Sequence, residues 1–522
     1  MTELTTKETK ILKALAQITK TGAAEEENDY IEKIFLPPEQ FENLLSGKTP
    51  LTFLIGQKGS GKSIIFVALQ NHFEKKDQLC LRLTPDKMQN VLQELKGADD
   101  SIAALKDRFY RSLTSSIAQE IGNSLSSQII PKNYNILRSC AIESGYSDKT
   151  FIEKLCSFPD DFGITGNFNF MNVNLTAKFG NEHKDNIQAI SKAIKKYLSK
   201  KKFYILIDDI DQLGKDQSKA SLDRIWGCLL ALRQISVELE HRLSCIVSLR
   251  REIWNQLIST NIEGRDQIDH LRNLVLPLSH SKDFIEKIID QRFEAAYRIA
   301  EQDCSEMEDN LPQLAKECCL LGQDLQVPGT AKEEKRSWID YFSNQTRNRP
   351  RDAMQLLYQA SDLALRRKEK INSEIMQNIS LRYSSERIDD IINENQYACD
   401  HLRPIIEKLT QLNFRSNFNE TKEILKKIPL QLPIGYIKIK GKTMKTNEEY
   451  TYLELWALLY ELGILNPRKK APDEKKGYRH LSYLDSPHFV SPQNLHEMQK
   501  VMWEIHPAYR SYLQSQKKDL DL

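Results

Sequence analysis

Short apolar runs alternate along this chain with longer stretches in which apolar residues recur at helical spacing. Continuous apolar runs of this length are typical of strands that are buried on both faces of a parallel sheet. They cover residues 51–55, 79–83, 203–207, 243–249 and 274–278. Pro277 lies in the last run, and because proline cannot donate to a sheet ladder, we expect that strand at an edge. The alternation predicts an α/β fold with a parallel sheet.

Other stretches have different patterns of apolar and polar residues. Ile11, Leu12, Leu15 and Ile18 predict a short amphipathic helix before an acidic link. Residues 85–157 have mostly helical spacing, carried by Ile102, Leu105, Phe109, Leu113 and Ile117. In residues 163–180, apolar residues occupy every second position, and this pattern then shifts by one residue. Because a one-residue step exchanges the two faces of a strand, the shift predicts a hairpin or a bulge.

Residues 56–63 form the pattern Gly-x-x-x-x-Gly-Lys-Ser between the first apolar run and a helix-compatible stretch at residues 64–69. This is the P-loop pattern in the context that it requires. The glycines let the backbone wrap around phosphate oxygens, and the following helix adds the positive end of its dipole. Lys62 is expected to reach the β- and γ-phosphates, and the Ser63 hydroxyl to hold Mg²⁺. The predicted nucleotide-binding residues are Gly56, Gln57, Lys58, Gly59, Ser60, Gly61, Lys62, Ser63 and Ile64.

Three carboxylates follow the apolar run at residues 203–207. They lie at the carboxyl end of the predicted strand, where ligands of open α/β sheets bind. Asp208 is placed to hold the Mg²⁺ shell, and Asp209 to orient or deprotonate the attacking water. Asp211 is expected to cap the next helix or to support the other two. A plain acidic surface loop is the alternative interpretation.

Arginines follow two further predicted elements. Arg250 and Arg251 come after the run at residues 243–249, where an arginine could sense the γ-phosphate or stabilise transition-state charge in a neighbouring subunit. Arg351 lies in the first turn of a helix predicted to start at residues 348–352, from which it could contact nucleotide phosphates as part of a lid. Ordinary surface arginines would explain the same residues.

Composition narrows the class of protein. The chain has 522 residues, which predicts two to four domains, and a net charge of +2, so any nucleic-acid or membrane binding would have to be local. Its nine cysteines are scattered, which favours a reducing compartment over a disulfide framework or a zinc site. We find neither a signal-type segment nor an apolar run long enough for a membrane span, so we expect a cytoplasmic protein without a membrane partner.

The P-loop, the Ile-Asp-Asp-Ile-Asp sequence at residues 207–211, the Ser-Leu-Arg sequence at 248–250 and the Arg-Pro-Arg-Asp sequence at 349–352 together resemble the AAA+ and STAND ATPases. The chain looks closest to bacterial P-loop ATPases of that group, some of which serve anti-phage defence. The resemblance implies a P-loop core with a parallel sheet, a helical lid and a C-terminal winged-helix-like domain. We expect an N-terminal arm at residues 1–29, the core at 30–280 with an insertion at about 85–200, the lid at 281–375 and the last domain at 376–522.

The resemblance also implies ATP and Mg²⁺ as ligands. Many AAA+ members have glutamate where this chain has Asp209, so we expect slow, switch-like hydrolysis. Nothing resembles the guanine-specificity motif, which favours ATP over GTP.

Three functions remain open. The leading one is an ATP-driven switch that forms a homo-oligomer and engages a protein effector. The second is a DNA-handling ATPase of the initiator or loader kind, which uses its winged helix. The third is a scaffold that binds ATP without hydrolysing it. The basic residues of the last domain surround Asp473 and Glu474, so we expect at most weak nucleic-acid binding. They are Lys469, Lys470, Lys475, Lys476 and Arg479.

Overall fold

The structure is a computed structural model and consists of two compact units. The sheet unit is Ala23–Ser279, and the C-terminal unit combines Met1–Gly22 with His280–Leu522. The residues described are 4–20, 30–83, 101–125, 134–143, 182–211, 218–239, 242–259, 271–301, 310–327, 335–396, 398–399, 401–432, 437–444, 451–471 and 478–520. The hairpin or bulge predicted at residues 163–180 and the acidic link before residue 30 lie outside these ranges.

Five parallel strands form the centre of the sheet unit, in the order β2-β3-β4-β1-β5. They are β1 (Leu51–Gly56), β2 (Leu79–Leu83), β3 (Phe203–Ile207), β4 (Leu243–Arg250) and β5 (Val275–Leu278). Each corresponds to one apolar run of the sequence, and β5 with Pro277 is an edge strand. The predicted α/β fold with a parallel sheet is confirmed.

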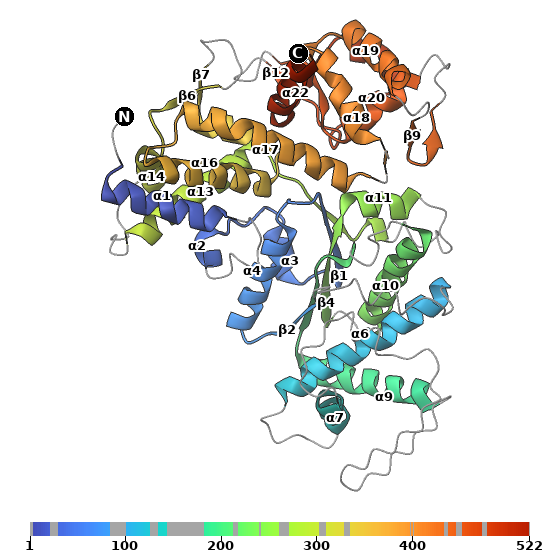
Figure 1. Cartoon of the computed structure of the whole chain (residues 1–522). Coiled ribbons are helices and arrows are strands. Elements are labelled where there is room, and N and C mark those ends of the chain that lie inside the picture. Colours follow the sequence, from blue (N-terminus) through green and yellow to red (C-terminus); the bar gives the residue numbers. More distant parts are fainter. Residues whose placement is uncertain are drawn as a thin grey trace. The chain divides into compact units, whose positions relative to one another are not determined.

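Helices cover both faces of this sheet (Figure 1). On one face, Tyr204 and Leu206 of β3 pack with α3 (Phe41–Ser46) and α4 (Lys62–Lys75). On the other face, Phe203, Ile205 and Ile207 pack with α6 (Ile102–Ser124) and α10 (Lys219–Glu238). Because successive side chains of a strand point to opposite faces, both sets must be apolar, which explains the continuous runs.

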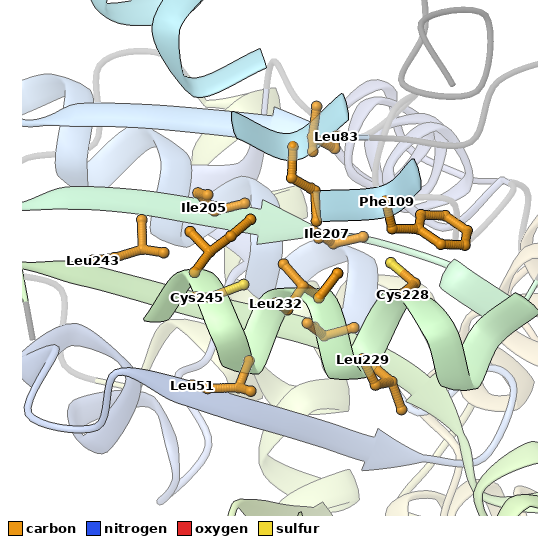
Figure 2. Close-up of a cluster of buried hydrophobic side chains, with 14 of the residues drawn as sticks. Leu51, Leu83, Phe109, Ile205, Ile207, Cys228, Leu229, Leu232, Leu243 and Cys245 are labelled. Atoms are coloured by element: carbon orange, nitrogen blue, oxygen red, sulfur yellow. The ribbon is translucent and has the colours of Figure 1, made fainter. Parts of the chain in front are cut away.

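Helix α10 fills the second face. Figure 2 shows Cys228, Leu229 and Leu232 of α10 among side chains of the strands, including Ile205 and Cys245. Against α6 the approach is so close that a Cβ on Gly227 would lie 2.8 Å from the Cβ of Leu105. Glycine at this position therefore permits the packing of α10 on α6. The other helical elements of the unit are α2 (Ile31–Ile34), α7 (Asn135–Glu143), α9 (Glu182–Tyr197), η3 (Leu198–Lys200) and α11 (Arg251–Ser259).

The first half of the C-terminal unit is helical. It contains α13 (Lys282–Ala300), α14 (Leu311–Cys319), α15 (Trp338–Asn344), α16 (Pro350–Arg367) and α17 (Ser373–Glu394), with a short antiparallel pair of strands, β6 (Asp324–Gln326) and β7 (Lys335–Ser337). Helix α1 (Thr6–Thr19) also belongs here, because it packs on α13 and α16. Its apolar face, Ile11, Leu12, Leu15 and Ile18, is fully buried. Helix α17 runs unbroken across the predicted boundary between residues 375 and 376.

A winged-helix-like domain completes this unit. Three helices, α18 (Leu402–Lys408), α19 (Phe418–Gln431) and α20 (Thr451–Glu461), precede the antiparallel hairpin of β11 (Leu465–Lys470) and β12 (Tyr478–His480). The sheet order is β12-β11-β13-β8, with β13 (Met502–Ile505) and β8 (Arg415–Ser416). The remaining elements are η6 (Leu409–Gln411), β9 (Lys438–Ile439), β10 (Lys442–Thr443), η7 (Pro492–Asn494), α21 (Leu495–Gln499) and α22 (Pro507–Leu520). The predicted C-terminal fold is confirmed, while Lys475 and Lys476 lie outside the described residues.

Within the ranges that the structure describes, no helix combines the length and the apolar character that crossing a membrane requires.

Candidate nucleotide site

The candidate site lies at the carboxyl edge of the sheet, where β1, β4 and β3 end side by side. Strand β4 lies between β1, which leads into the P-loop, and β3, which leads into the carboxylates. In the register of β1 with β4, Gly56 is opposite Arg250. The sheet therefore brings together residues from three distant parts of the sequence, at the edge where open α/β sheets bind ligands.

The P-loop has the tight backbone that its glycines allow. Gly61 has a φ of 88° and is the N-cap of α4, a left-handed conformation that side-chain-bearing residues rarely adopt. At Gly56, a Cβ would lie 2.5 Å from the Oγ of Ser60. The loop is closed by a 3.2 Å hydrogen bond from the N–H of Ser60 to the carbonyl of Gln57. This wrapped backbone at a helix N-terminus is an anion-binding geometry.

Lys62 lies over this loop. Its Nζ donates hydrogen bonds of 3.1 Å to the carbonyl oxygens of Gly56 and Gln57, and the residue is buried. Burial lowers the pKa of Lys62, while the negative charges of Asp211 and Asp209 oppose that shift. The amino group is thus fixed at the loop between the P-loop backbone and the carboxylates.

Asp208 is a buried carboxylate of the site. Burial and repulsion from Asp209 raise its pKa, while hydrogen bonds from Ser248 and Ser63 and the charge of Arg82 lower it. The Ser248 hydroxyl donates to Oδ1 at 2.7 Å, and an Arg82 nitrogen lies 3.6 Å from Oδ2. The Ser63 hydroxyl is thus near enough to Asp208 to lower its pKa, which places the two predicted oxygen ligands of Mg²⁺ close to each other.

Sequence analysis did not identify Ser248 and Arg82 as site residues. Both are polar residues within mostly apolar strands, Arg82 in β2 and Ser248 in β4. Each lies near the carboxyl end of its strand, on the same sheet edge as Asp208. A polar residue just before the end of a buried strand is the signal that would have found them.

Asp209 has a φ of 50°, in the left-handed region. Its N–H donates to Ser248 Oγ at 2.9 Å and to Asp208 Oδ1 at 3.0 Å. These hydrogen bonds fix the turn that follows β3. Aspartate tolerates such a conformation better than most residues, because its short polar side chain can hydrogen-bond locally.

Asp211 pairs with Arg250. Arg250 Nε lies 2.7 Å from Asp211 Oδ2, and Asp211 is buried. Burial raises the pKa of Asp211 to about 6 although Arg250 opposes the shift. The N-cap of α10, the next helix that the structure describes, is Ser218, so Asp211 does not cap it. Arg251 is the first residue of α11 and is partly exposed.

Ile34, Phe35 and Ile64 lie near the start of α4. Phe35 and Ile64 are partly buried and pack against Ile31 and Val67. Phe35 also makes an edge-on contact with Phe41 at 5.0 Å between ring centroids. Ile34 is buried. Core packing therefore accounts for the side chains of Ile34 and Phe35.

Arg351 belongs to the C-terminal unit, in the first turn of α16. Two neighbouring arginines are held in buried ion pairs, Arg347 with Asp352 at 2.8 Å and Arg349 with Glu394 at 2.9 Å. Arg351 is partly exposed, and within the described part of the chain no ion pair holds it. Of these three arginines, Arg351 is the one whose side chain is not used to build the unit.

Two family models match parts of the chain. The model described as Zeta toxin matches residues 40–157, which include the P-loop. The model described as FunZ-associated C-terminal helical domain matches residues 321–392, from the end of α14 into α17. No curated protein matches the chain.

Two solved structures are similar over most of their length. The ORC2 protein of Aeropyrum pernix, in ADPNP-ADP complexes, is 11% identical with a TM-score of 0.40 and covers 93% of this chain and 96% of its own. The Aeropyrum pernix ORC1 protein in complex with DNA is 12% identical with a TM-score of 0.32, covering 95% and 96%. Neither likeness is strong enough to carry an argument about this chain.

The fold and the site define a P-loop NTPase. The P-loop wraps at the N-terminus of α4, with Lys62 over it and the buried carboxylate of Asp208 near Ser63. A site of this kind binds a nucleotide.

Proposed function

We propose that this chain is an ATP-hydrolysing molecular switch that converts ATP and water slowly to ADP and phosphate. The observation that carries the proposal is the wrapped P-loop beside the buried Asp208 carboxylate, with the Ser63 hydroxyl near enough to lower the pKa of Asp208. A P-loop alone binds phosphate, but a hydroxyl and a buried carboxylate at its edge form the oxygen-rich site that Mg²⁺ prefers. Magnesium at such a site neutralises charge on the β- and γ-phosphates.

The remaining residues have separate roles in this proposal. The P-loop backbone from Gly56 to Gly61 holds the phosphates, and Lys62 supplies positive charge to the β- and γ-phosphates. Ser248 and Arg82 favour the ionised form of Asp208, although burial and Asp209 raise its pKa overall. Asp209 accepts a proton from the attacking water, or orients that water. Its carboxylate is one methylene shorter than glutamate, which supports slow turnover.

The C-terminal domain favours a protein partner over a DNA-reading role. In winged-helix proteins that read bases, a recognition helix lies in the major groove. The corresponding helix here, α20, is described throughout, and its single exposed side chain is Glu454. Tyr452, Trp456 and Tyr460 of this helix are buried in the core of the domain. A buried helix with an exposed carboxylate is poorly suited to a phosphate-lined groove.

The second candidate, a DNA-handling ATPase, depends on the basic β11–β12 hairpin, in which Lys469 is opposite Arg479. Replacing Lys469, Lys470, Lys475, Lys476 and Arg479 with glutamine tests it. Under the switch proposal, DNA binding at physiological salt is weak, with a Kd of roughly 10⁻⁴–10⁻⁶ M, and ATP hydrolysis in the variant is unchanged. A nanomolar, sequence-selective complex that vanishes in the variant would favour DNA handling instead.

The experiment that tests the proposal itself is Lys62→Ala. The expected result is loss of ATP hydrolysis and weaker ATP binding with little change in melting temperature, because the Lys62 amino group bonds P-loop carbonyls and Lys62 is not part of the apolar core of the sheet. Lys75→Ala at the far end of α4 is the matched control, since Lys75 is exposed and pairs only with Glu32 among the described residues. If Lys62→Ala hydrolyses ATP as fast as the wild type and the Lys75→Ala control, Lys62 is not part of an ATP-hydrolysing site.

Three further points stay predictions: assembly into a homo-oligomer, control of a protein effector and a place in bacterial anti-phage defence. Size and ATPase rate measured together, with and without ATP, test the first of these. A nucleotide-dependent change in size supports a switch that works through assembly, whereas binding without any turnover supports the scaffold alternative.

A further inference from the structure

One buried carboxylate of the site has no role in the proposed function. Asp211 is only 4% exposed, yet it lies in the same short turn as the carboxylates that follow β3. Its Oδ1 has no hydrogen-bond partner among the described residues, whereas its Oδ2 lies 2.7 Å from Arg250 Nε. Burying a carboxylate is costly, so a partner of opposite charge is needed to keep it in place.

Asp211 contacts Arg250 at Nε. A guanidinium group usually meets a carboxylate or a phosphate through two nitrogens. Here the closest contact is made through Nε, Asp211 Oδ1 accepts no hydrogen bond among the described residues, and the Arg250 side chain is still 34% exposed. No other ion pair of Arg250 is found in the described part of the chain.

The register of the strands places the Asp211–Arg250 pair beside the P-loop. Arg250 is the last residue of β4, and in the register with β1 it is opposite Gly56, the first glycine of the P-loop. The charges of Asp211 and Arg250 both act on Lys62, which itself lies on the carbonyl of Gly56. The pair therefore stands beside the lysine that contacts the β- and γ-phosphates in the proposed reaction.

We propose that Asp211 is a positioning residue, which holds Arg250 by Nε so that the two terminal nitrogens face the γ-phosphate of bound ATP. This inference rests on the proposed function and adds to it the residue that orients the arginine. Lysine cannot replace Arg250 in this arrangement, because a single ammonium group cannot both pair with Asp211 and present two donors in a fixed plane.

The burial of Asp211 is consistent with this role. An exposed ion pair would let the arginine rotate, since exposed pairs contribute little free energy. A carboxylate buried on one side of the guanidinium restricts its orientations before any ligand is present. Preorganised donors of this kind are more effective than flexible ones at stabilising developing charge.

The experiment measures ATP hydrolysis and nucleotide binding in Asp211→Asn, Arg250→Ala and the double variant. Asp211→Asn keeps the size of the side chain and removes its charge, so kcat should fall about 10–100-fold, the effect of losing one hydrogen bond to a charged group. If Asp211 acts through Arg250, the same substitution made on Arg250→Ala should change kcat less than about 2-fold. Arg250→Lys should resemble Arg250→Ala, and Asp211→Glu should recover part of the activity.

A second measurement separates positioning from damage to the fold. Because ADP lacks the γ-phosphate, its Kd should be unchanged in Asp211→Asn, while the Kd of a non-hydrolysable ATP analogue should rise. Asp107→Asn is the matched control, since Asp107 forms an Asp–Arg pair of the same length, 2.7 Å, on α6. Its kinetics should equal those of the wild type.

Two results would overturn the inference. Additive effects of the two substitutions would mean that Asp211 does not act through Arg250. Equal weakening of ADP and of the ATP analogue would mean that Asp211 supports the fold of the site and not the γ-phosphate contact. If the wild type neither binds nor hydrolyses ATP, the proposed function itself is wrong, and the inference falls with it.

Discussion

The hydroxyl of Ser248 donates a 2.7 Å hydrogen bond to Oδ1 of Asp208. Ser248 is at the end of β4 and Asp208 directly follows β3, so this contact joins two neighbouring strands at the edge of the sheet. It also lowers the pKa of Asp208, against burial, which raises it. The ionised form that Mg²⁺ requires thus depends on a serine from a different strand.

Ser248→Ala should weaken Mg²⁺ binding and slow hydrolysis. Removing a hydrogen bond to a charged group costs about 1.5–3 kcal/mol, which corresponds to a loss of about 10–100-fold in kcat/KM. The magnesium concentration that gives half-maximal ATPase rate should rise as well. Titration of the ATPase with Mg²⁺ at fixed ATP measures both effects.

Ser244→Ala is the control for this substitution. Ser244 is buried in the same strand but at its other end, where its hydroxyl donates to the carbonyl of Thr49 at 3.4 Å. It should show the wild-type dependence on Mg²⁺. If the wild type, Ser248→Ala and Ser244→Ala gave the same dependence of ATPase rate on Mg²⁺, Ser248 would have no role in the magnesium site.

Asp209→Asn should separate binding from hydrolysis. Asparagine keeps the size of the side chain and tolerates the left-handed φ of 50° at this position, so the turn should be retained. Loss of the base should reduce hydrolysis by roughly 10²–10⁴-fold while ATP affinity survives. Single-turnover rates and equilibrium binding of the same preparation test this, and a normal rate would assign the proton transfer to another residue.

Arg251 is the better candidate for action on a neighbouring subunit, because Arg250 is committed to Asp211. If Arg251 acts in trans, neither Arg251→Ala nor Lys62→Ala alone should hydrolyse ATP well. A mixture of the two should regain part of the activity, since some interfaces then combine an intact Lys62 with an intact Arg251. Activity of the mixture that never exceeds the average of the two variants would place Arg251 in its own subunit's site.

Glu504 should make the stability of the C-terminal domain dependent on pH. Burial would raise its pKa, but the hydrogen bonds and charges of His480 and Arg510 outweigh burial and hold the pKa well below its usual range. Arg510 lies 2.6 Å from Oε1, and Arg415 lies 3.1 Å from the same oxygen. Because the folded pKa is depressed, the stabilisation is complete above about pH 4.5, the ordinary value, and is lost as the pH falls further.

Glu504→Gln should therefore destabilise the domain by about 3–5 kcal/mol at neutral pH, the cost of breaking a buried pair. The difference from the wild type should shrink as the pH falls below about 4.5, because the wild-type carboxyl then also becomes neutral. Hydrogen exchange of the amides of β13 measures it. Glu497→Gln, which removes an exposed pair with Lys500, should change exchange little, and a pH-independent difference for Glu504→Gln would exclude the mechanism.

The elements of the sheet unit could be predicted from the sequence because burial on two faces leaves a local signature. Residues 203–207 are all apolar and buried for this reason, and β3 coincides with them. The P-loop was also predictable, since its chemistry depends on consecutive residues from Gly56 to Ser63. In both cases the residues that the fold or the site requires are consecutive in the sequence, so the local pattern identifies them.

The contacts of the candidate site were less predictable, because they depend on which strands are neighbours. The order of the strands places β4 between β1 and β3, and nothing in a single strand encodes that order. Asp211 was expected to cap a helix or to support the neighbouring carboxylates, but its nearest partner is Arg250 on β4. Ser248 was visible in the sequence as part of a family-like pattern, yet its hydrogen bond to Asp208 became apparent only in the structure.

Helix α1 has a consequence for the synthesis of the protein. Its partners in the C-terminal unit, α13 and α16, begin at Lys282 and Pro350. The entire sheet unit is translated between them, and domains generally fold as units during synthesis. The apolar stripe of Ile11, Leu12, Leu15 and Ile18 must therefore stay uncovered on the ribosome until most of the chain has emerged. Helix α1 is therefore made well before the helices on which it packs.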